Sequence, residues 1–574
     1  MYRSFQSTFT GRVREDRISK LDDAVLGHVL SFLPSKQAAG AAALSSRWRD
    51  AFAGVHTISV EEPEGAVPTY DDSGRRDSHD DDLPWDATPS RFGATITAAI
   101  VARHRRPAAT LPLRALRVSL HNYRYRDAVA VDQWVSYALK QAGHELELDL
   151  RLRCLPIYCR RAYDIEIKAD APTVKDPGTG VRAVASITNP KEDHTDDDDE
   201  SEEEHERVLE GPSLLLYKES FRMYTVPRAL FSCSALRTLR IGPCRLSPPS
   251  AISLPSLEEL FLTRVPDGEE EVQRLISACP RLADLTLEAC DTVTALSLVD
   301  APRLRRLALR CCHNLTGVFL DVSELGAFEY RGAVPKIPFL TMFSTEGGWF
   351  LTMPSLTSCT IDICSGEILA PEELSRLTAF LHQFASAKHL RLRSKRLCPG
   401  IGRDAVTSFP AFQKLQHLEL WGHLAHDGDA TAVMDTTSKI LQHAPNLEVL
   451  SFVFETWIRT DVDDNGPLPP GRYRCKEGEL LDAHRLRYNQ YNVLNAPSGG
   501  AIIPCLANRV RAVNLVHYQG GRAQRTLAKF LLCNAPVIGE LWCQFAEGPL
   551  WVQTKLMEEM KGWVMNEKAN TVFR

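Results

Sequence analysis

The densest group of reactive side chains in this sequence is Cys311-Cys312-His313, in which two thiols precede an imidazole. Thiolates and imidazoles bind zinc, and they also act as nucleophiles and bases in enzymes. Cys312, however, occupies the last position of a leucine-spaced repeat, where a small buried side chain is expected. We therefore interpret this run as repeat core and expect neither a metal site nor a catalytic cysteine.

Other patterns with catalytic potential are weak. His417, His423 and His426 lack the spacing of a helical metal site, so we expect them on the surface or in loops. Residues 178–183, Gly-Thr-Gly-Val-Arg-Ala, have the form of a dinucleotide loop but follow Asp-Pro rather than a convincing strand. The motifs GxxxxGK[ST], HExxH and GxSxG do not occur. The sequence thus predicts a protein that is not an enzyme and uses no cofactor.

Composition and charge restrict the compartment and the partners. The 15 cysteines include no CxxC pair, which favours reduced thiols in the cytoplasm or the nucleus. No segment approaches the roughly 18 to 20 apolar residues of a membrane-spanning helix. The net charge of −6 arises from residues 191–206, which hold eleven acids and one lysine, so the remainder is nearly neutral. We expect neither a membrane nor a nucleic-acid partner.

Leucines recur with the spacing Leu-x-x-Leu-x-Leu-x-x-Cys, which is typical of leucine-rich repeats. The pattern or a variant of it starts at Leu236, Leu257, Leu282, Leu304, Leu325 and Leu356, then at Leu415 and Leu447, and more weakly at Leu113, Leu146, Leu390 and Val510. The first six starts are 21, 25, 22, 21 and 31 residues apart. Most of the 574 residues therefore belong to one repeat array rather than to four separate domains.

Each copy predicts a short strand whose last two leucines point into the array while the residues between them point outward. The segments between copies supply helices, as in the apolar spacing of Val272, Leu275 and Ile276. A single unit cannot bury its own apolar side, so neighbouring units must stack into a curved solenoid. The fold class is α/β, and the cysteines at the ninth position become buried thiols.

A pair of apolar helices is expected before the repeats. Residues 21–33 carry leucines and valines at helical spacing, and Pro34 ends this helix. A second helix is expected from Gln37 through Leu44 to Trp48. Together they form a hairpin with more apolar surface than it can bury alone, which predicts packing on the solenoid or on a partner protein.

These residues resemble a known family. The runs Asp-Arg-Ile-Ser at 16–19, Leu-Ser-Phe-Leu-Pro at 30–34 and Leu-Ser-Ser-Arg-Trp-Arg at 44–49 resemble the F-box of plant proteins. Residues 505–542, with Leu-Leu-Cys-Asn-Ala-Pro at 531–536, resemble the FBD segment that closes many plant F-box/leucine-rich-repeat proteins. Members usually have proline where this chain has Asp22, and Asp can cap the helix instead.

The resemblance implies a domain order. It consists of a flexible N-terminus at 1–15, an F-box at 16–60, a linker with an acidic insert at 61–112, and the solenoid at 113–455 with a disordered loop at about 188–208. An irregular insert at 456–504 and an FBD-like segment with a terminal helix at 505–574 follow.

The resemblance also implies a function, that of the substrate receptor of a Skp/cullin/F-box ubiquitin ligase. The F-box would bind the Skp-type adaptor, and through it cullin, while the repeats capture an unknown protein target. Residues implied to face the adaptor are Leu21, Val25, Leu26, Val29, Leu30, Leu33, Pro34, Leu44, Arg47 and Trp48, although some of them must hold the hairpin together.

The outward positions of the strands select a candidate target surface. Arg306, Arg310 and Arg331 could converge on an acidic or phosphorylated segment, and solvated arginines are the alternative. Arg391, Arg393 and Trp421 are further candidates on later strands. An alternative function is a repeat scaffold that binds a partner without recruiting a ligase, and Asp22 is the feature in its favour.

Overall fold

The structure, a computed structural model, describes residues 20–62, 91–104, 111–120, 123, 127–152, 223–344, 348–364, 371–397, 410–424, 430–455, 486 and 503–574. Several sequence interpretations lie outside these residues. They are the N-terminus at 1–15, the motif at 16–19, the glycine-containing run at 178–183, the acidic loop at about 188–208, His426 and nearly all of the insert at 456–504.

Helices occur mainly towards the two ends of the chain, and β6 to β13 follow one another without a helix in the described residues. The helices are α1 (Asp23–Leu30), α2 (Ser35–Leu44), α3 (Ser46–Ala51), α4 (Arg91–Arg103), α5 (Ala128–Gln141), α8 (Glu269–Ser277), α9 (Pro371–His382), α10 (Ala430–Gln442), α12 (Pro504–Asn508), α13 (Arg522–Cys533) and α14 (Leu550–Trp563), with the 3-10 turns η1 (Phe52–Gly54) and η4 (Arg228–Ser232).

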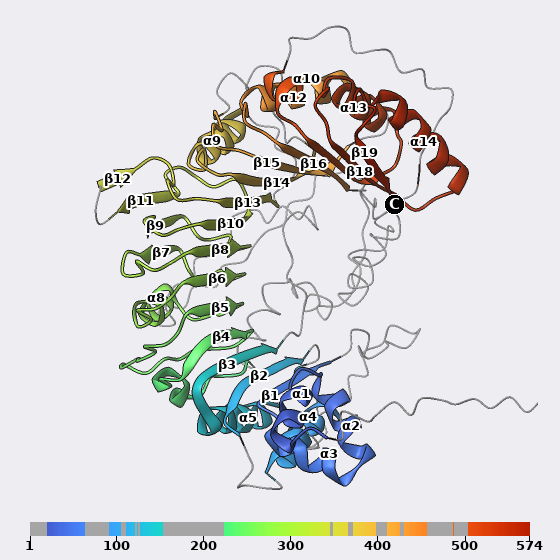
Figure 1. The fold of residues 1–574 in the computed structure, drawn as a ribbon. Helices are drawn as coiled ribbons and strands as arrows, with labels where there is room; N and C mark the ends of the chain where they lie inside the picture. The colour runs from blue at the N-terminus through green and yellow to red at the C-terminus, as the bar shows by residue number, and fades with distance from the viewer. Residues whose placement is uncertain are drawn as a thin grey trace, which may run out of the picture.

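Fifteen strands form one parallel sheet. In spatial order they are β1 (Thr57–Glu61), β2 (Leu113–Leu120), β3 (Ala142–Leu152), β4 (Leu236–Gly242), β5 (Glu259–Thr263), β6 (Asp284–Glu288), β8 (Arg306–Arg310), β10 (Ala327–Gly332), β13 (Ser358–Ile363), β14 (His389–Arg396), β15 (His417–His423), β16 (Val449–Glu455), β17 (Ala512–Tyr518), β18 (Glu540–Phe545) and β19 (Asn570–Phe573). Figure 1 shows them side by side along an arc.

Each of the twelve leucine-spaced copies named from the sequence forms a strand of this sheet. Residues at the leucine positions are buried, and those between them are more exposed, as in β15, where burial alternates at every residue. Equivalent leucines of neighbouring strands are paired in register, such as Leu285 with Leu307. The mixed α/β class and the repeat strands are therefore confirmed.

A second sheet was not predicted from the sequence. Its strands are β7 (Ala295–Leu298), β9 (Gly317–Asp321), β11 (Leu340–Ser344) and β12 (Gly348–Phe350), in the order β12-β11-β9-β7. They lie on the outer side of the arc, where helices α8 and α9 cover neighbouring units (Figure 1). Short extended segments thus replace a helix as the return path in these units.

One hydrophobic core runs through the described residues from α1 to α14. Leu26 and Leu30 of α1 belong to the same cluster as the repeat leucines, so the amino-terminal helices pack onto the sheet. Arg103 of α4 is also fully buried, and its guanidinium donates to the carbonyl oxygens of Val55 and Leu111 at 2.5 and 2.6 Å. These bonds fasten α4 to the segments that lead into β1 and β2.

Two helix boundaries differ from the sequence prediction. Helix α1 ends at Leu30 rather than at Pro34, because the N–H groups of Phe32 and Leu33 donate to the carbonyls three residues back, at Val29 and Leu30, and form turns in place of α-helix. The second predicted helix is divided into α2 and α3, because Ser45 adopts an extended backbone and its hydroxyl accepts from the Trp48 N–H at 3.2 Å. Among the described helices, none has the length and apolarity to cross a membrane.

Candidate functional site

Helix α1 begins at a polar cap. The Asp22 carboxylate accepts a hydrogen bond from the Val25 backbone N–H at 2.7 Å, which satisfies one of the unpaired donors of the first turn. The sequence expectation that Asp can replace the usual proline as the start of this helix is confirmed. Asp22 therefore does not argue against a folded amino-terminal motif.

Helix α1 has two apolar stripes that face different environments. Leu26 and Leu30, one turn apart, are 1% and 0% exposed and belong to the core. Val25 and Val29, also one turn apart, are 41% and 42% exposed. Residues spaced by four lie on the same side of a helix, so one stripe is buried in this chain and the other faces outward.

The close fit of α1 against η1 depends on Gly27. A Cβ at Gly27 would lie 2.8 Å from the carbonyl carbon of Gly54, which is closer than real Cβ contacts. Gly27 thereby allows the backbones of α1 and η1 to come into contact. The side chains of Leu26 and Leu30 are buried on the same helix.

The outward stripe of α1 continues onto neighbouring residues. Phe32, in the turn after α1, is 75% exposed, and Leu44, at the end of α2, is 83% exposed. We call Leu21, Val25, Val29, Phe32 and Leu44 the amino-terminal apolar surface. Contiguous exposed patches of large apolar side chains mark interaction sites, so these five residues are the candidates for one.

The residues that the family resemblance implies to face an adaptor differ in their exposure in the structure. Leu21, Val25, Val29, Pro34 and Leu44 are exposed. Leu26 and Leu30 are buried in the core, so in this chain they are among the residues that hold the hairpin together. Leu33 and Trp48 are half-buried and pack against the core.

Arg47 has an internal role at this surface. Its guanidinium donates to the Leu21 carbonyl and forms an ion pair with Asp23, Nε to Oδ1, at 3.2 Å. It thus ties the start of α3 to the start of α1. The sequence missed Phe32, although its position three residues after Val29 continues the exposed stripe.

Arginine side chains on the large sheet are paired with acids of neighbouring strands. Arg306 lies 3.9 Å from Asp284 and 3.5 Å from Glu329, and Arg310 lies 2.7 Å from Glu329. Arg331 lies 3.4 Å from Asp362. The three arginines that the sequence grouped do lie on adjacent strands, β8 and β10, but each is paired with an acid of a neighbouring strand.

Electrostatics follow this pairing. The hydrogen bond with Glu329 raises the pKa of Arg310. Burial would raise the pKa of Glu329, but hydrogen bonds and charges from Arg310 and Arg306 outweigh it and lower that pKa. Arg306, Arg310 and Arg331 therefore do not form an uncompensated positive patch, which weakens the expectation that they capture a phosphorylated segment.

A second cluster lies further along the sheet. The guanidiniums of Arg391 and Arg393 stand 5.7 and 5.3 Å from the ring centroid of Trp421, which is half-buried. Arg391 is also paired with Glu419 at 3.0 Å, and Arg393 with Glu455 at 2.7 Å. The structure therefore brings together the three candidates that the sequence named on these strands.

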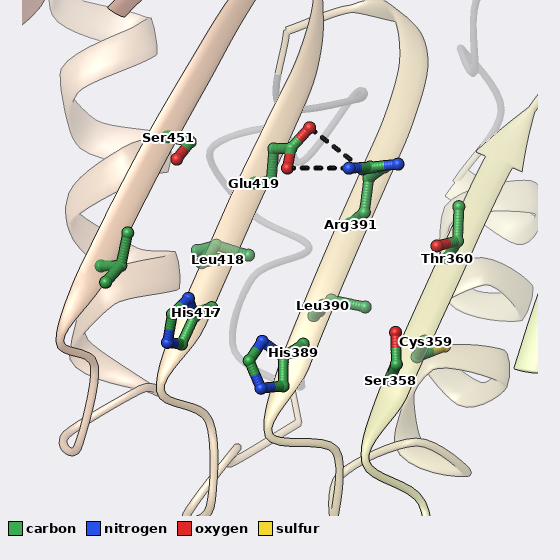
Figure 2. Close-up of a pocket in the computed structure, with 11 residues that line it drawn as sticks. Ser358, Cys359, Thr360, His389, Leu390, Arg391, His417, Leu418, Glu419 and Ser451 are labelled. Carbon is green, nitrogen blue, oxygen red and sulfur yellow. Dashed lines mark hydrogen bonds and ion pairs between the residues drawn. The ribbon is translucent and has the colours of Figure 1, made fainter. Parts of the chain in front are cut away.

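A pocket of about 260 Å³ opens beside this cluster (Figure 2). Its lining comes from β13 to β16 and includes Arg391, Glu419, His389, His417 and Ser451. The two histidine rings lie 4.3 Å apart, and burial, His417 and Lys388 lower the pKa of His389. The pocket offers hydrogen-bond donors and acceptors to a polar side chain of a bound partner.

Comparisons with known proteins match part of the repeats to a family model and longer stretches of the chain to Arabidopsis thaliana proteins. The family model described as "FBD-associated F-box protein At5g56370, LRR repeats" matches residues 212–325. The Arabidopsis thaliana F-box/FBD/LRR-repeat protein At2g04230 is 23% identical over 80% of this chain and 80% of its own length. These matches confirm the resemblance to the plant F-box/FBD/LRR family.

Two further Arabidopsis thaliana proteins match this chain over shorter regions. The Arabidopsis F-box/LRR-repeat protein At3g60040 is 24% identical over 61% of each chain. The putative F-box protein At1g49610 is 30% identical over 25% of this chain. The chain spans 34% of the length of At1g49610 and 61% of that of At3g60040.

Proposed function

We propose that this chain is the substrate-recognition subunit of a Skp/cullin/F-box ubiquitin ligase. In this proposal residues 16–60 are an F-box whose amino-terminal apolar surface binds the Skp-type adaptor, and through it cullin. The strands form a curved solenoid whose open face captures a target protein. The names of the similar Arabidopsis proteins, which combine F-box with LRR or FBD, support it.

One observation carries the proposal: Val25 and Val29 are exposed on a helix whose neighbouring stripe, Leu26 and Leu30, is already buried in the chain. A helix whose apolar side chains were all buried in its own chain would offer no apolar surface to a partner. Specific protein interfaces are anchored by a few apolar and aromatic side chains within about 800 Å² per partner. Leu21, Phe32 and Leu44 supply such anchors around the two valines.

The proposed mechanism involves no bond making by this chain. A receptor raises the local concentration of target lysines beside the charged ubiquitin-conjugating enzyme, and a rigid spacer maintains that concentration. The continuous core from α1 to α14 supplies this rigidity, because it joins the amino-terminal helices directly to the sheet. We place the activity in the cytoplasm or the nucleus, where the free thiols of the described residues would stay reduced.

The proposal is tested by gel filtration of the purified full-length chain with a purified Skp-type adaptor. We expect both proteins to elute together at equal stoichiometry and to bind cullin when it is added. A repeat scaffold that recruits no ligase would elute separately from the adaptor at micromolar concentrations, and that result would refute the proposal.

A further inference from the structure

Two strand ends of the large sheet bring a histidine and two distant cysteines together. Cys311 follows β8, His313 lies two residues later, and Cys364 follows β13. Strand β10 lies between β8 and β13 and holds both cysteines at its carboxyl end. The Cys311 N–H donates to the Arg331 carbonyl at 2.5 Å, and the Cys364 N–H donates to the next carbonyl, that of Gly332, at 2.8 Å.

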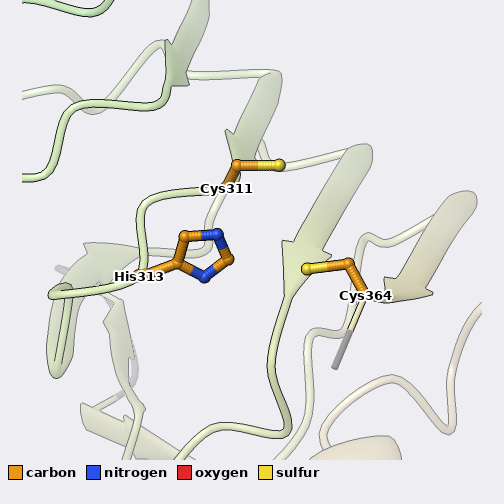
Figure 3. A group of neighbouring side chains, drawn as sticks. All are labelled: Cys311, His313 and Cys364. Carbon is orange, nitrogen blue, oxygen red and sulfur yellow. The ribbon is translucent and has the colours of Figure 1, made fainter. Parts of the chain in front are cut away.

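The three side chains are close enough to share one ion. The two Sγ atoms and a ring nitrogen of His313 all lie within 4.8 Å of one another, and Figure 3 shows the three side chains gathered beside these strand ends. Zinc bound tetrahedrally at about 2.3 Å from sulfur and 2.0 Å from nitrogen separates such atoms by about 3.5 Å. A movement of about 1 Å, within reach of side-chain rotation, would therefore complete the coordination.

The repeat pattern does not explain this cluster. Cys290 and Cys312, at the ninth position of their repeats, donate to the carbonyl oxygens of Leu262 and Leu287. Cys311 and Cys364 form a buried pair separate from the main core, although Cys364 is also a ninth-position cysteine. The sequence interpretation excluded a ligand role because Cys312 belongs to the repeat, but the cluster uses its neighbour.

The backbone at Cys311 is set by the repeat and not by the side chain. Its φ is 55°, and Arg264 and Ala289, directly after β5 and β6, have φ of 49° and 52°. The same left-handed turn thus closes three consecutive units. Of the three turn residues, only Cys311 is a cysteine, and it is the one that lies near Cys364.

The chemistry of the three groups selects the ion. Two thiolates and an imidazole are soft donors that suit zinc, which carries just the charge that two thiolates neutralise. Cys311 and Cys364 are buried, and both ring nitrogens of His313 are shielded from solvent. Few water molecules can therefore compete with these atoms for the ion. The nearest arginines in sequence, Arg310 and Arg331, are paired with Glu329 and Asp362 and do not present an unbalanced positive charge.

We propose that Cys311, His313 and Cys364 bind one zinc ion that joins the ends of β8 and β13 across β10. Three protein ligands leave the fourth position to water or to a ligand from outside the cluster. The site would lock the middle of the sheet, and it is independent of adaptor binding at α1.

The test uses the full-length chain, reduced and freed of metal, titrated with Co²⁺ as a spectroscopic substitute for zinc. We expect one equivalent to bind with thiolate-to-cobalt charge-transfer absorption, and Zn²⁺ to displace it. Cys364→Ala should lose this equivalent. Cys312→Ala, which removes the adjacent thiol outside the cluster, should retain it.

Folding is checked by circular dichroism for each variant, and His313→Ala serves where a cysteine variant fails to fold, because it should also lose the absorption. Absence of charge-transfer absorption in the reduced wild-type chain would overturn the proposal. Retention of the full equivalent by folded Cys364→Ala or His313→Ala would overturn it as well.

Discussion

Val25 and Leu26 are neighbours in α1, yet Val25 is 41% exposed while Leu26 is 1% exposed. This difference separates the residues that build the amino-terminal helices from those available to a partner. It also decides which substitutions are informative. A charge at Leu26 would disrupt the core and reveal nothing of adaptor binding, whereas a charge at Val25 alters only the amino-terminal apolar surface.

The contact between α1 and η1 predicts opposite effects for two glycines. Gly27→Ala should lower the thermal unfolding midpoint by several degrees, because the new Cβ would lie 2.8 Å from Gly54. Gly40→Ala is the matched control: its Cβ meets nothing within 4 Å in the middle of α2. There alanine should stabilise by about 0.5–1 kcal/mol. Equal midpoints for the two variants, measured by calorimetry, would contradict this packing.

The cap of α1 predicts a graded series at Asp22. Asp22→Ala removes the acceptor of the Val25 N–H and should cost about 1 kcal/mol of stability. Asp22→Asn keeps a side-chain oxygen at the same place and should cost less. Denaturant unfolding measures the free energies, and hydrogen exchange at the Val25 amide reports the bond itself. Unchanged exchange in Asp22→Ala would show that the carboxylate does not hold this amide.

The two histidines between α1 and β1 predict a loss of stability in acid. His28 Nδ1 lies 2.9 Å from His56 Nε2, and burial, Arg114, His28 and Arg103 lower the pKa of His56 below 6.5. The unfolded chain then takes up its proton at a higher pH than the folded chain does. Stability therefore falls as the pH drops below about 6.5 and levels off below the folded pKa.

The measurement is the thermal midpoint of wild type and His56→Gln between pH 7.5 and 5.5. The fall should be smaller in the variant, because one titrating group with a lowered pKa is gone. His389 and His517, whose pKa values are also lowered by burial, remain in both proteins and account for the residual fall. Identical slopes would rule out a contribution from His56.

Target capture should depend on the cluster around Trp421 more than on the arginines of β8 and β10. Affinity purification under proteasome inhibition, read by mass spectrometry, should lose specific partners with Trp421→Ala. Arg306→Gln removes a charge that is already balanced by Asp284 and Glu329, so it should change recovery less. The reverse order of effects would restore the arginine cluster as the target surface.

The repeat strands could be predicted from sequence because each core leucine recurs at fixed spacing, and register then follows from the parallel sheet. Leu26 and Val25 could not be sorted, because both faces of α1 are apolar and only the position of η1 decides which is covered. The short strands β7, β9, β11 and β12 lie in the segments between copies, where the sequence predicts helices. The meeting of Cys311 and Cys364, 53 residues apart, needs the pairing of β8, β10 and β13.

Titration calorimetry of a Skp-type adaptor with the full-length chain tests the proposed docking role most directly. The variant Val25→Asp/Val29→Asp alters the amino-terminal apolar surface, and Val129→Asp alters a 69% exposed valine of α5 as a matched control. We expect the double variant to weaken binding by at least about tenfold, equivalent to about 1.4 kcal/mol, and Val129→Asp to bind like wild type. Equal affinity of all three proteins, or no binding by wild type, would contradict the role of this surface.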